Sequence, residues 1–164
     1  MSEKIKLLVV DDEERFLQTL THRLRLREFD VTPAASGQEA IELARSREFD
    51  LALLDLKMPG MGGEEVLRTL KEEHPLIEVV ILTGHGSIDS AVDCTRAGSY
   101  NYLQKPCETE ELLEVLKQAY TRHVERKLSG DRARLEELAR IAVGESPLGI
   151  LERLRALKER SGRR

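Results

Sequence analysis

The chain has 164 residues, 40% of them hydrophobic and 34% charged, and a formal net charge of −4, which is typical of a soluble globular protein with one domain and an appendage. No apolar run approaches the roughly 18 residues of a transmembrane helix, and the first residues lack the apolar segment of a signal peptide, so we expect no membrane insertion. Two cysteines, Cys94 and Cys107, are too few for a disulfide framework and favour reduced thiols in a cytoplasmic protein.

Apolar runs alternate along the chain with amphipathic stretches, which predicts a parallel sheet with crossover helices. The predicted strands cover residues 5–10, 29–34, 51–54, 78–82 and 99–103. Apolar residues at helical spacing predict helices that end near 27, start at about 37, cover 64–73 and about 87–96, and run from about 109 to 128. Short connections and right-handed crossovers favour an α/β fold with a doubly wound, flavodoxin-like sheet, a (βα)5 order and the strand order 2-1-3-4-5.

Individual residues further constrain the second predicted strand and the start of the fifth predicted helix. Pro33 suits only the edge or the end of a strand, because it cannot donate to the ladder. Thr109 is a plausible N-cap for the fifth helix, and Glu110 and Glu111 behind it suit the positive end of a helix dipole.

The charge is unevenly distributed along the chain. Residues 1–121 hold 14 Lys and Arg against 23 Asp and Glu, whereas residues 122–164 hold 12 against 7. An acidic body followed by a basic tail predicts a boundary near residue 122. We therefore expect one domain over 1–121 and, over 122–164, an extended last helix with a short helical tail.

Three carboxylates lie at the ends of predicted strands. Asp55 follows the apolar run Leu51–Leu54 and precedes a loop rich in glycine and proline, so we expect it in the crevice where open α/β sheets bind ligands. Asp11 and Asp12 follow the first strand, and adjacent carboxylates on such a turn suit Mg²⁺, which prefers hard oxygen ligands. The simpler alternatives are that Asp55 caps the next element and that acids favour the first turn of a helix, but the second explains Asp11 poorly.

A hydroxyl and a cation lie at two further strand ends. Thr83-Gly84 follows the fourth strand and Lys105-Pro106 follows the fifth, although each could be an ordinary turn. Together with the acids, they predict a site where Asp55 accepts a phosphoryl group, since catalysis of that transfer is largely positioning and charge neutralisation. Mg²⁺ and Lys105 would offset charge on the phosphoryl oxygens, and Thr83 would donate a hydrogen bond to one of them.

These residues closely resemble the receiver domain of bacterial response regulators, from residue 5 to about 121. The matching residues are Asp11, Asp12, Asp55, the stretch 57–63, Thr83, Gly84, Lys105 and Pro106. The resemblance implies a two-component phosphorelay in which Asp55 takes its phosphoryl group from a sensor histidine kinase or a phosphotransfer protein. It also implies that Asp11, Asp12, Asp55 and the backbone carbonyl of Lys57 hold Mg²⁺.

The resemblance assigns further roles. Tyr102 matches the switch aromatic that turns inward as Thr83 moves toward the phosphate, and Lys57 and His85 occupy the positions that tune dephosphorylation. The stretches 84–87 and 97–103 are most similar to receivers of enhancer-binding activators, in which an ATPase domain usually follows. These 164 residues contain no G-x-x-x-x-G-K-[ST] loop, so we expect no NTPase in them.

The tail is predicted to hold two short amphipathic helices. One covers about 131–143, and the other follows Ser146-Pro147, which form a good cap and first-turn pair. Two such helices are marginal alone and need a surface to bury against, so we expect a homodimer or docking on the receiver. The resemblance of 142–147 to the start of an ATPase domain is short, and the basic ending is typical of a solvated terminus.

The leading hypothesis is therefore a phosphorylation-switched signalling module that alters contacts with a downstream protein, and not a dedicated enzyme. One rival is a DNA-binding transcription regulator that uses the basic tail. Roughly 35 tail residues look too few for the effectors that usually follow receivers, so DNA is not an expected partner. A second rival is a phosphatase with a nucleophilic D-x-D motif, which we reject because Leu56 and Lys57 follow Asp55.

Overall fold

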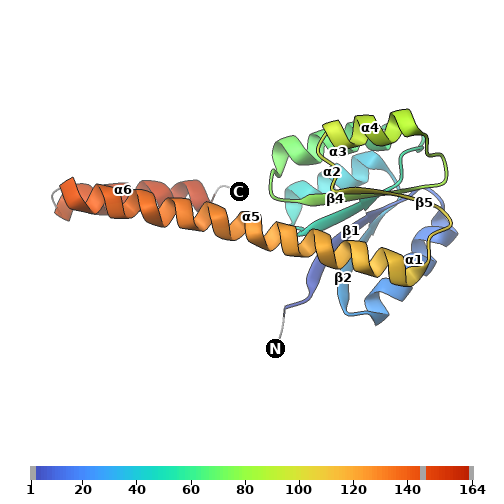
Figure 1. Cartoon of the computed structure of the whole chain (residues 1–164), viewed down its shortest axis with the longest axis horizontal. Helices are drawn as coiled ribbons and strands as arrows, with labels where there is room; N and C mark the ends of the chain where they lie inside the picture. Colours follow the sequence, from blue (N-terminus) through green and yellow to red (C-terminus); the bar gives the residue numbers. More distant parts are fainter. Residues whose placement is uncertain (1–2, 145–146, 163–164) are drawn as a thin grey trace. The chain divides into compact units, whose positions relative to one another are not determined.

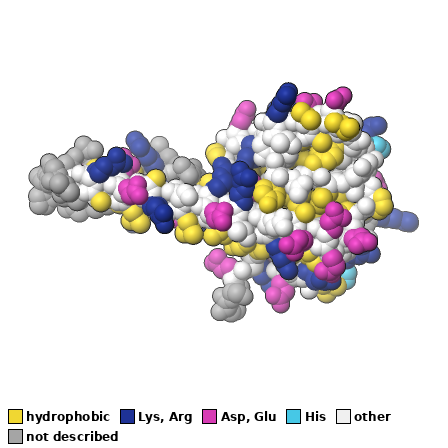
Figure 2. Space-filling view, viewed as in Figure 1, with side chains coloured by type: hydrophobic (Ala, Val, Ile, Leu, Met, Phe, Trp, Pro, Cys, Tyr) yellow, Lys and Arg dark blue, Asp and Glu magenta, His cyan; other side chains and the backbone are white. Residues whose placement is uncertain are grey.

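The structure is a computed structural model that describes residues 3–144 and 147–162. The chain divides into two compact units, Met1–His123 and Val124–Arg164. None of the described helices is long and apolar enough to cross a membrane. Charged side chains of both signs and small apolar patches are scattered over the visible face of the larger unit (Figure 2).

The first unit is built on a parallel five-stranded sheet with the order β2-β1-β3-β4-β5, which confirms the predicted topology (Figure 1). The strands are β1 (Ile5–Val10), β2 (Phe29–Ala34), β3 (Leu51–Leu54), β4 (Glu78–Thr83) and β5 (Asn101–Gln104). The fourth strand is one residue longer than predicted, and the fifth begins two residues later. Pro33 lies on the edge strand β2, as expected, where it pairs with Val9.

Helices cover both faces of this sheet (Figure 1). They are α1 (Glu14–Leu26), α2 (Gly37–Ser46), α3 (Gly63–Glu73), α4 (Ile88–Arg96) and α5 (Thr109–Gly144). On one face, α1 and α5 bury leucines such as Leu20 and Leu116 against Leu7 and Val9 of β1. On the other face, α2, α3 and α4 pack against the alternate residues of the same strand. Each buried leucine contributes about 1.5–3 kcal/mol, so the apolar strands hold the sheet between its two helical layers.

Local sequence sets where several helices begin. The Ser36 hydroxyl accepts a hydrogen bond from the Glu39 N–H at the start of α2, and Ser87 and Ser90 form a reciprocal capping box at the start of α4. Thr109 is the first residue of α5 rather than its N-cap, because the Glu108 carbonyl already accepts from the Leu112 N–H. Such caps satisfy N–H groups that have no partner within the helix.

The predicted end of the fifth helix near residue 128 is wrong. Helix α5 runs without a break from Thr109 to Gly144, so the separate helix predicted over about 131–143 is its continuation. Gly130 costs a helix only about 1 kcal/mol relative to alanine, and a proline would be needed for a sharp stop. Helix α6 (Pro147–Gly162) begins at the predicted proline, whereas the predicted cap Ser146 lies outside the described residues.

Candidate functional site

Asp11 is held at the carboxyl end of β1 by its backbone and its side chain. Its N–H donates to the Ala34 carbonyl at 3.1 Å, and its Oδ1 accepts from the Glu13 N–H at 2.9 Å. The residue is 2% exposed, whereas Asp12 beside it is exposed. The turn from β1 to α1 therefore presents one buried and one accessible carboxylate.

Asp55 lies at the end of the neighbouring strand β3 and is 3% exposed. Its N–H donates to the Val10 carbonyl at 3.0 Å, and its Oδ1 accepts from the Leu56 N–H at 2.9 Å. Behind it the backbone at Gly63 approaches so closely that a β-carbon there would fall on the Asp55 carbonyl oxygen. Only glycine fits at that position, and the start of α3 is thereby packed against the loop that carries Asp55.

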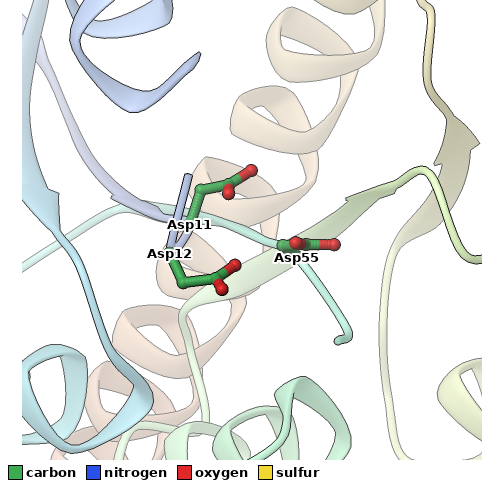
Figure 3. Close-up of side chains that lie close together, drawn as sticks. All are labelled: Asp11, Asp12 and Asp55. Carbon is green, nitrogen blue, oxygen red and sulfur yellow. The ribbon is translucent and has the colours of Figure 1, made fainter. Parts of the chain in front are cut away.

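The three carboxylates come together as the sequence predicted. Ligand oxygens of Asp11, Asp12 and Asp55 all lie within 4.8 Å of one another, and Figure 3 shows them gathered at one place. Like charges at this distance repel strongly when two of the three groups are buried. The cluster therefore favours a cation among its oxygens.

Lys105 supplies one positive charge to the cluster from the end of β5. Its Nζ lies 2.6 Å from Asp11 Oδ2 and 3.9 Å from Asp55 Oδ2. The ammonium group also lies 4.0 Å from the centre of the Phe16 ring of α1, a contact that helps to hold a cation. Sequence reasoning gave Phe16 only a core role, because an apolar residue at helical spacing carries no sign of such a contact.

Thr83 ends β4 and is fully buried. Its hydroxyl accepts a hydrogen bond from the His85 N–H at 3.2 Å, so the side chain interacts with its own loop. Its carbonyl accepts from the Lys105 N–H at 2.8 Å, which joins the two strand ends. The hydroxyl and the lysine therefore belong to adjacent strands at the same edge of the sheet.

The tyrosine predicted to switch is restrained by a partner that the sequence did not reveal. The Tyr102 hydroxyl lies 2.8 Å from Ser90 Oγ of α4, and its ring packs against the core on the α4 side of the sheet. A β-carbon at Gly86 would lie 2.8 Å from the same hydroxyl. Tyr102 thus links β5 to α4 and to the loop that follows Thr83.

The residues predicted to tune dephosphorylation are both exposed. Lys57 lies two residues after Asp55, and His85 lies two residues after Thr83. Met58, between Lys57 and the Pro59-Gly60 turn, is 8% exposed and anchors this loop in the core beside α3. The side chains of Lys57 and His85 are therefore presented to solvent, on the loops that follow Asp55 and Thr83.

One known protein family matches most of this chain. Residues 7–117 match the response regulator receiver domain. The chain belongs to this family. Its receiver domain is similar to that of the alginate biosynthesis transcriptional regulatory protein AlgB of Pseudomonas aeruginosa, at 36% identity over 124 residues. That match covers 75% of this chain and 28% of the relative.

Other receivers agree with this assignment. The luminescence regulatory protein LuxO of Vibrio campbellii is 39% identical over 102 residues, which cover 62% of this chain and 22% of the relative. The chain thus spans about a quarter of the length of these curated relatives. Among solved structures, a CheY-like receiver domain protein from Methanospirillum hungatei aligns with a TM-score of 0.73 at 28% identity, covering 76% of this chain and 99% of that one.

The residues present fit the magnesium ion that receiver domains bind at an acidic pocket. Three carboxylates face the single ammonium group of Lys105, so the described site carries excess negative charge. All the gathered ligand atoms are carboxylate oxygens, which a small, hard divalent cation prefers. One acid is accessible, which leaves a path for the ion from solvent.

Proposed function

We propose that this receiver domain is a phosphorylation-dependent signalling switch in which Asp55 accepts the phosphoryl group. The observation that supports this most directly is the buried Asp55 carboxylate, clustered with Asp11 and Asp12 and lying 3.9 Å from the Lys105 ammonium group. The donor is a sensor histidine kinase or a phosphotransfer protein, and the compartment is the cytoplasm. Self-catalysed transfer to Asp55 and its hydrolysis are the only chemistry, so the protein is not a dedicated enzyme.

In the transfer step, a carboxylate oxygen of Asp55 forms a bond to phosphorus as the bond between phosphorus and the donor's imidazole nitrogen breaks. The electron pair of the broken bond stays with the imidazole. Asp11, Asp12, Asp55 and the backbone carbonyl of Lys57 would hold Mg²⁺, which neutralises charge on the phosphoryl oxygens. Lys105 lies close enough to Asp55 to ion-pair with the new phosphate, and burial of Asp55 strengthens that attraction.

The readout of the phosphate would start at Thr83. Its hydroxyl would exchange the hydrogen bond that it accepts from the His85 N–H for one that it donates to a phosphoryl oxygen. That change would move the loop at Gly86, against which the Tyr102 hydroxyl packs, and would free Tyr102 from Ser90 so that it turns inward. Lys57 and His85, both exposed beside the site, would set the rate of hydrolysis. The altered surface around α4 and β5 would then bind a downstream protein or a second copy of this chain.

The test is to incubate the protein with Mg²⁺ and acetyl phosphate and to follow its intact mass. We expect the gain of one phosphoryl group, its loss in Asp55→Asn, and no change in the matched control Asp30→Asn, an exposed aspartate on β2. Size measured on the same samples shows whether phosphorylation makes or breaks a dimer. Phosphorylation of Asp55→Asn at the normal rate would refute the assignment of Asp55.

A DNA-binding role is the alternative, and one observation favours it. Residues 122–164 carry 12 Lys and Arg against 7 Asp and Glu. Electrostatic binding to a phosphate backbone weakens steeply with salt. Titration with duplex DNA at low and high salt tests this role, and the absence of binding at low salt would remove it.

A further inference from the structure

His123 is a buried histidine at the edge of the sheet opposite to the phosphoacceptor. It is the last residue of the first unit and lies on α5, with 7% of its surface exposed. Its Nδ1 lies 2.7 Å from the Leu76 carbonyl oxygen, in the loop before β4. Its Nε2 lies 3.1 Å from Asp50 Oδ1, directly before β3. The ring thus bridges α5 to the amino ends of two central strands.

The Leu76 carbonyl and the Asp50 carboxylate are both hydrogen-bond acceptors. A neutral imidazole carries one N–H and would leave one acceptor facing a nitrogen lone pair, whereas the imidazolium ion donates at both nitrogens. Burial of a charged ring is costly, but an opposite charge within about 4–6 Å offsets that cost. Asp50 supplies this charge in a fixed position, because its Oδ2 also accepts a hydrogen bond from the Lys6 N–H at 2.9 Å.

The state of Asp50 agrees with this geometry. Burial by itself raises the pKa of the Asp50 carboxyl, but the hydrogen bonds from His123 and the Lys6 N–H, together with their charges, bring this pKa below its ordinary value. Asp50 is therefore an anion throughout the neutral range. The imidazole faces a full negative charge on one side and a carbonyl dipole on the other.

Arg122 and Lys71, two other cations near this edge, have partners of their own. The Arg122 guanidinium lies 3.8 Å from Glu78, which is buried at the start of β4. Lys71 donates to the carbonyls of Pro75 and Ile77, on either side of Leu76, and so holds in place the loop that His123 contacts. Other titratable side chains close to these residues in the sequence include Lys6, His74, Tyr120 and Arg126. Tyr120 stacks on the His123 ring with centroids 6.0 Å apart.

We propose that His123 is a proton-dependent latch, an imidazolium ion that ties α5 to the amino edge of the sheet and releases one of its two bonds when it loses its proton. Helix α5 also continues into the second unit, and His123 lies at the boundary between the units. Proton loss would therefore loosen this helix at that boundary, independently of the phosphoacceptor at the other edge.

Two measurements on the full chain test the latch. Long-range ¹H–¹⁵N spectra report whether each histidine ring is cationic, and His123→Gln assigns the signal. We expect both nitrogens of the His123 ring to carry a proton at neutral pH. In Asp50→Asn, which keeps the acceptor oxygen but removes its charge, we expect the His123 midpoint to fall by about 1 pH unit or more. A His123 ring with only one protonated nitrogen at neutral pH would overturn the proposal.

Hydrogen exchange measures the consequence for α5. After correction for intrinsic rates, protection of amides 120–126 should fall about tenfold as the pH rises through the His123 midpoint, because a hydrogen bond involving a charged group is lost. The drop should occur at lower pH in Asp50→Asn and at the wild-type pH in the control His22→Gln. Unchanged protection of β1 and β3 shows that the variants are folded. Protection of α5 that is independent of pH in the wild type would refute the latch.

Discussion

Charged side chains are arranged differently at the carboxyl ends of the strands, called the carboxyl edge, and at their amino ends, called the amino edge. At the carboxyl edge, the carboxylates of Asp11, Asp12 and Asp55 lie within 4.8 Å of one another and share the single ammonium group of Lys105 (Figure 3). At the amino edge, Asp50 pairs with His123, and the buried Glu78 pairs with Arg122. The first edge gathers more carboxylates than cations, whereas at the second edge each of these two carboxylates has a basic side chain beside it.

This difference shows which edge is built for a ligand. Like charges held together in a buried place raise the free energy of the folded chain, and a cation that binds among them lowers it again. Opposite charges with filled hydrogen bonds gain nothing from a ligand and instead stabilise the contact between α5 and the strands. The same parallel sheet thus has a cluster suited to a ligand at the carboxyl ends of its strands and a contact with α5 at their amino ends.

The largest expected effect comes from the close backbone contact behind Asp55. Gly63→Ala would place a β-carbon on the Asp55 carbonyl and 2.7 Å from Leu56 Cα, both of them backbone atoms. We expect a loss of about 3 kcal/mol or more in the free energy of unfolding, because backbone cannot yield without moving the loop. The matched control is Gly62→Ala, where the nearest atom would be 3.7 Å away. Urea unfolding of both variants checks this, and equal stability would contradict it.

A smaller effect is expected at the amino edge. Asp50→Asn should lower the free energy of unfolding by about 1.5–3 kcal/mol at neutral pH, since the hydrogen bonds from His123 and the Lys6 N–H lose the negative charge of their acceptor. Because the folded pKa of Asp50 is lowered, its contribution is fully present above its ordinary pKa of 3.8 and is lost as the pH falls through the folded value. Urea unfolding from neutral to acid pH should therefore show the two proteins converging below about pH 4. A constant difference down to acid pH would count against the pairing.

At the carboxyl edge, by contrast, removal of a carboxylate charge should not lower the free energy of unfolding. Asp12→Asn removes an exposed carboxylate from the cluster, so we expect Mg²⁺ affinity to fall about tenfold or more. Without Mg²⁺, the free energy of unfolding should stay within about 0.5 kcal/mol or rise, because repulsion is relieved. Calorimetric titration with Mg²⁺ and urea unfolding without it measure the two quantities. If Asp12→Asn destabilises the protein as much as Asp50→Asn does, the two edges do not differ in the way proposed.

The smallest effect is expected away from both edges, in the part of α5 beyond His123. Gly130 lies inside the helix, and a β-carbon there would meet no atom of the described residues within 4 Å. Gly130→Ala should therefore raise helix stability by about 0.5–1 kcal/mol, because alanine loses less backbone entropy. Thermal unfolding followed by circular dichroism provides the measurement, and a fall in stability would indicate that the helix needs glycine at this position.

Much of the fold and of the carboxyl edge could be predicted because both depend on short-range patterns. The run Leu51–Leu54 is apolar at every position, which identifies a strand buried on both faces, and the acid that follows must lie at its carboxyl end. Parallel strands place all such ends at one edge, so Asp11, Asp55 and Lys105 were predicted to meet although 94 residues separate the first from the last. The end of α5 was misplaced because Gly130 weakens a helix without stopping it.

What the sequence by itself determined is therefore the order of the strands, the edge at which the polar residues gather and the chemistry of their carboxylates. The tertiary structure alone decided which partners those residues take. Phe16 contacts Lys105, Ser90 contacts Tyr102, and His123 joins Asp50 at the amino end of β3. The reason is physical: periodicity reports which face of an element is buried, whereas a contact between two elements depends on how they pack in three dimensions.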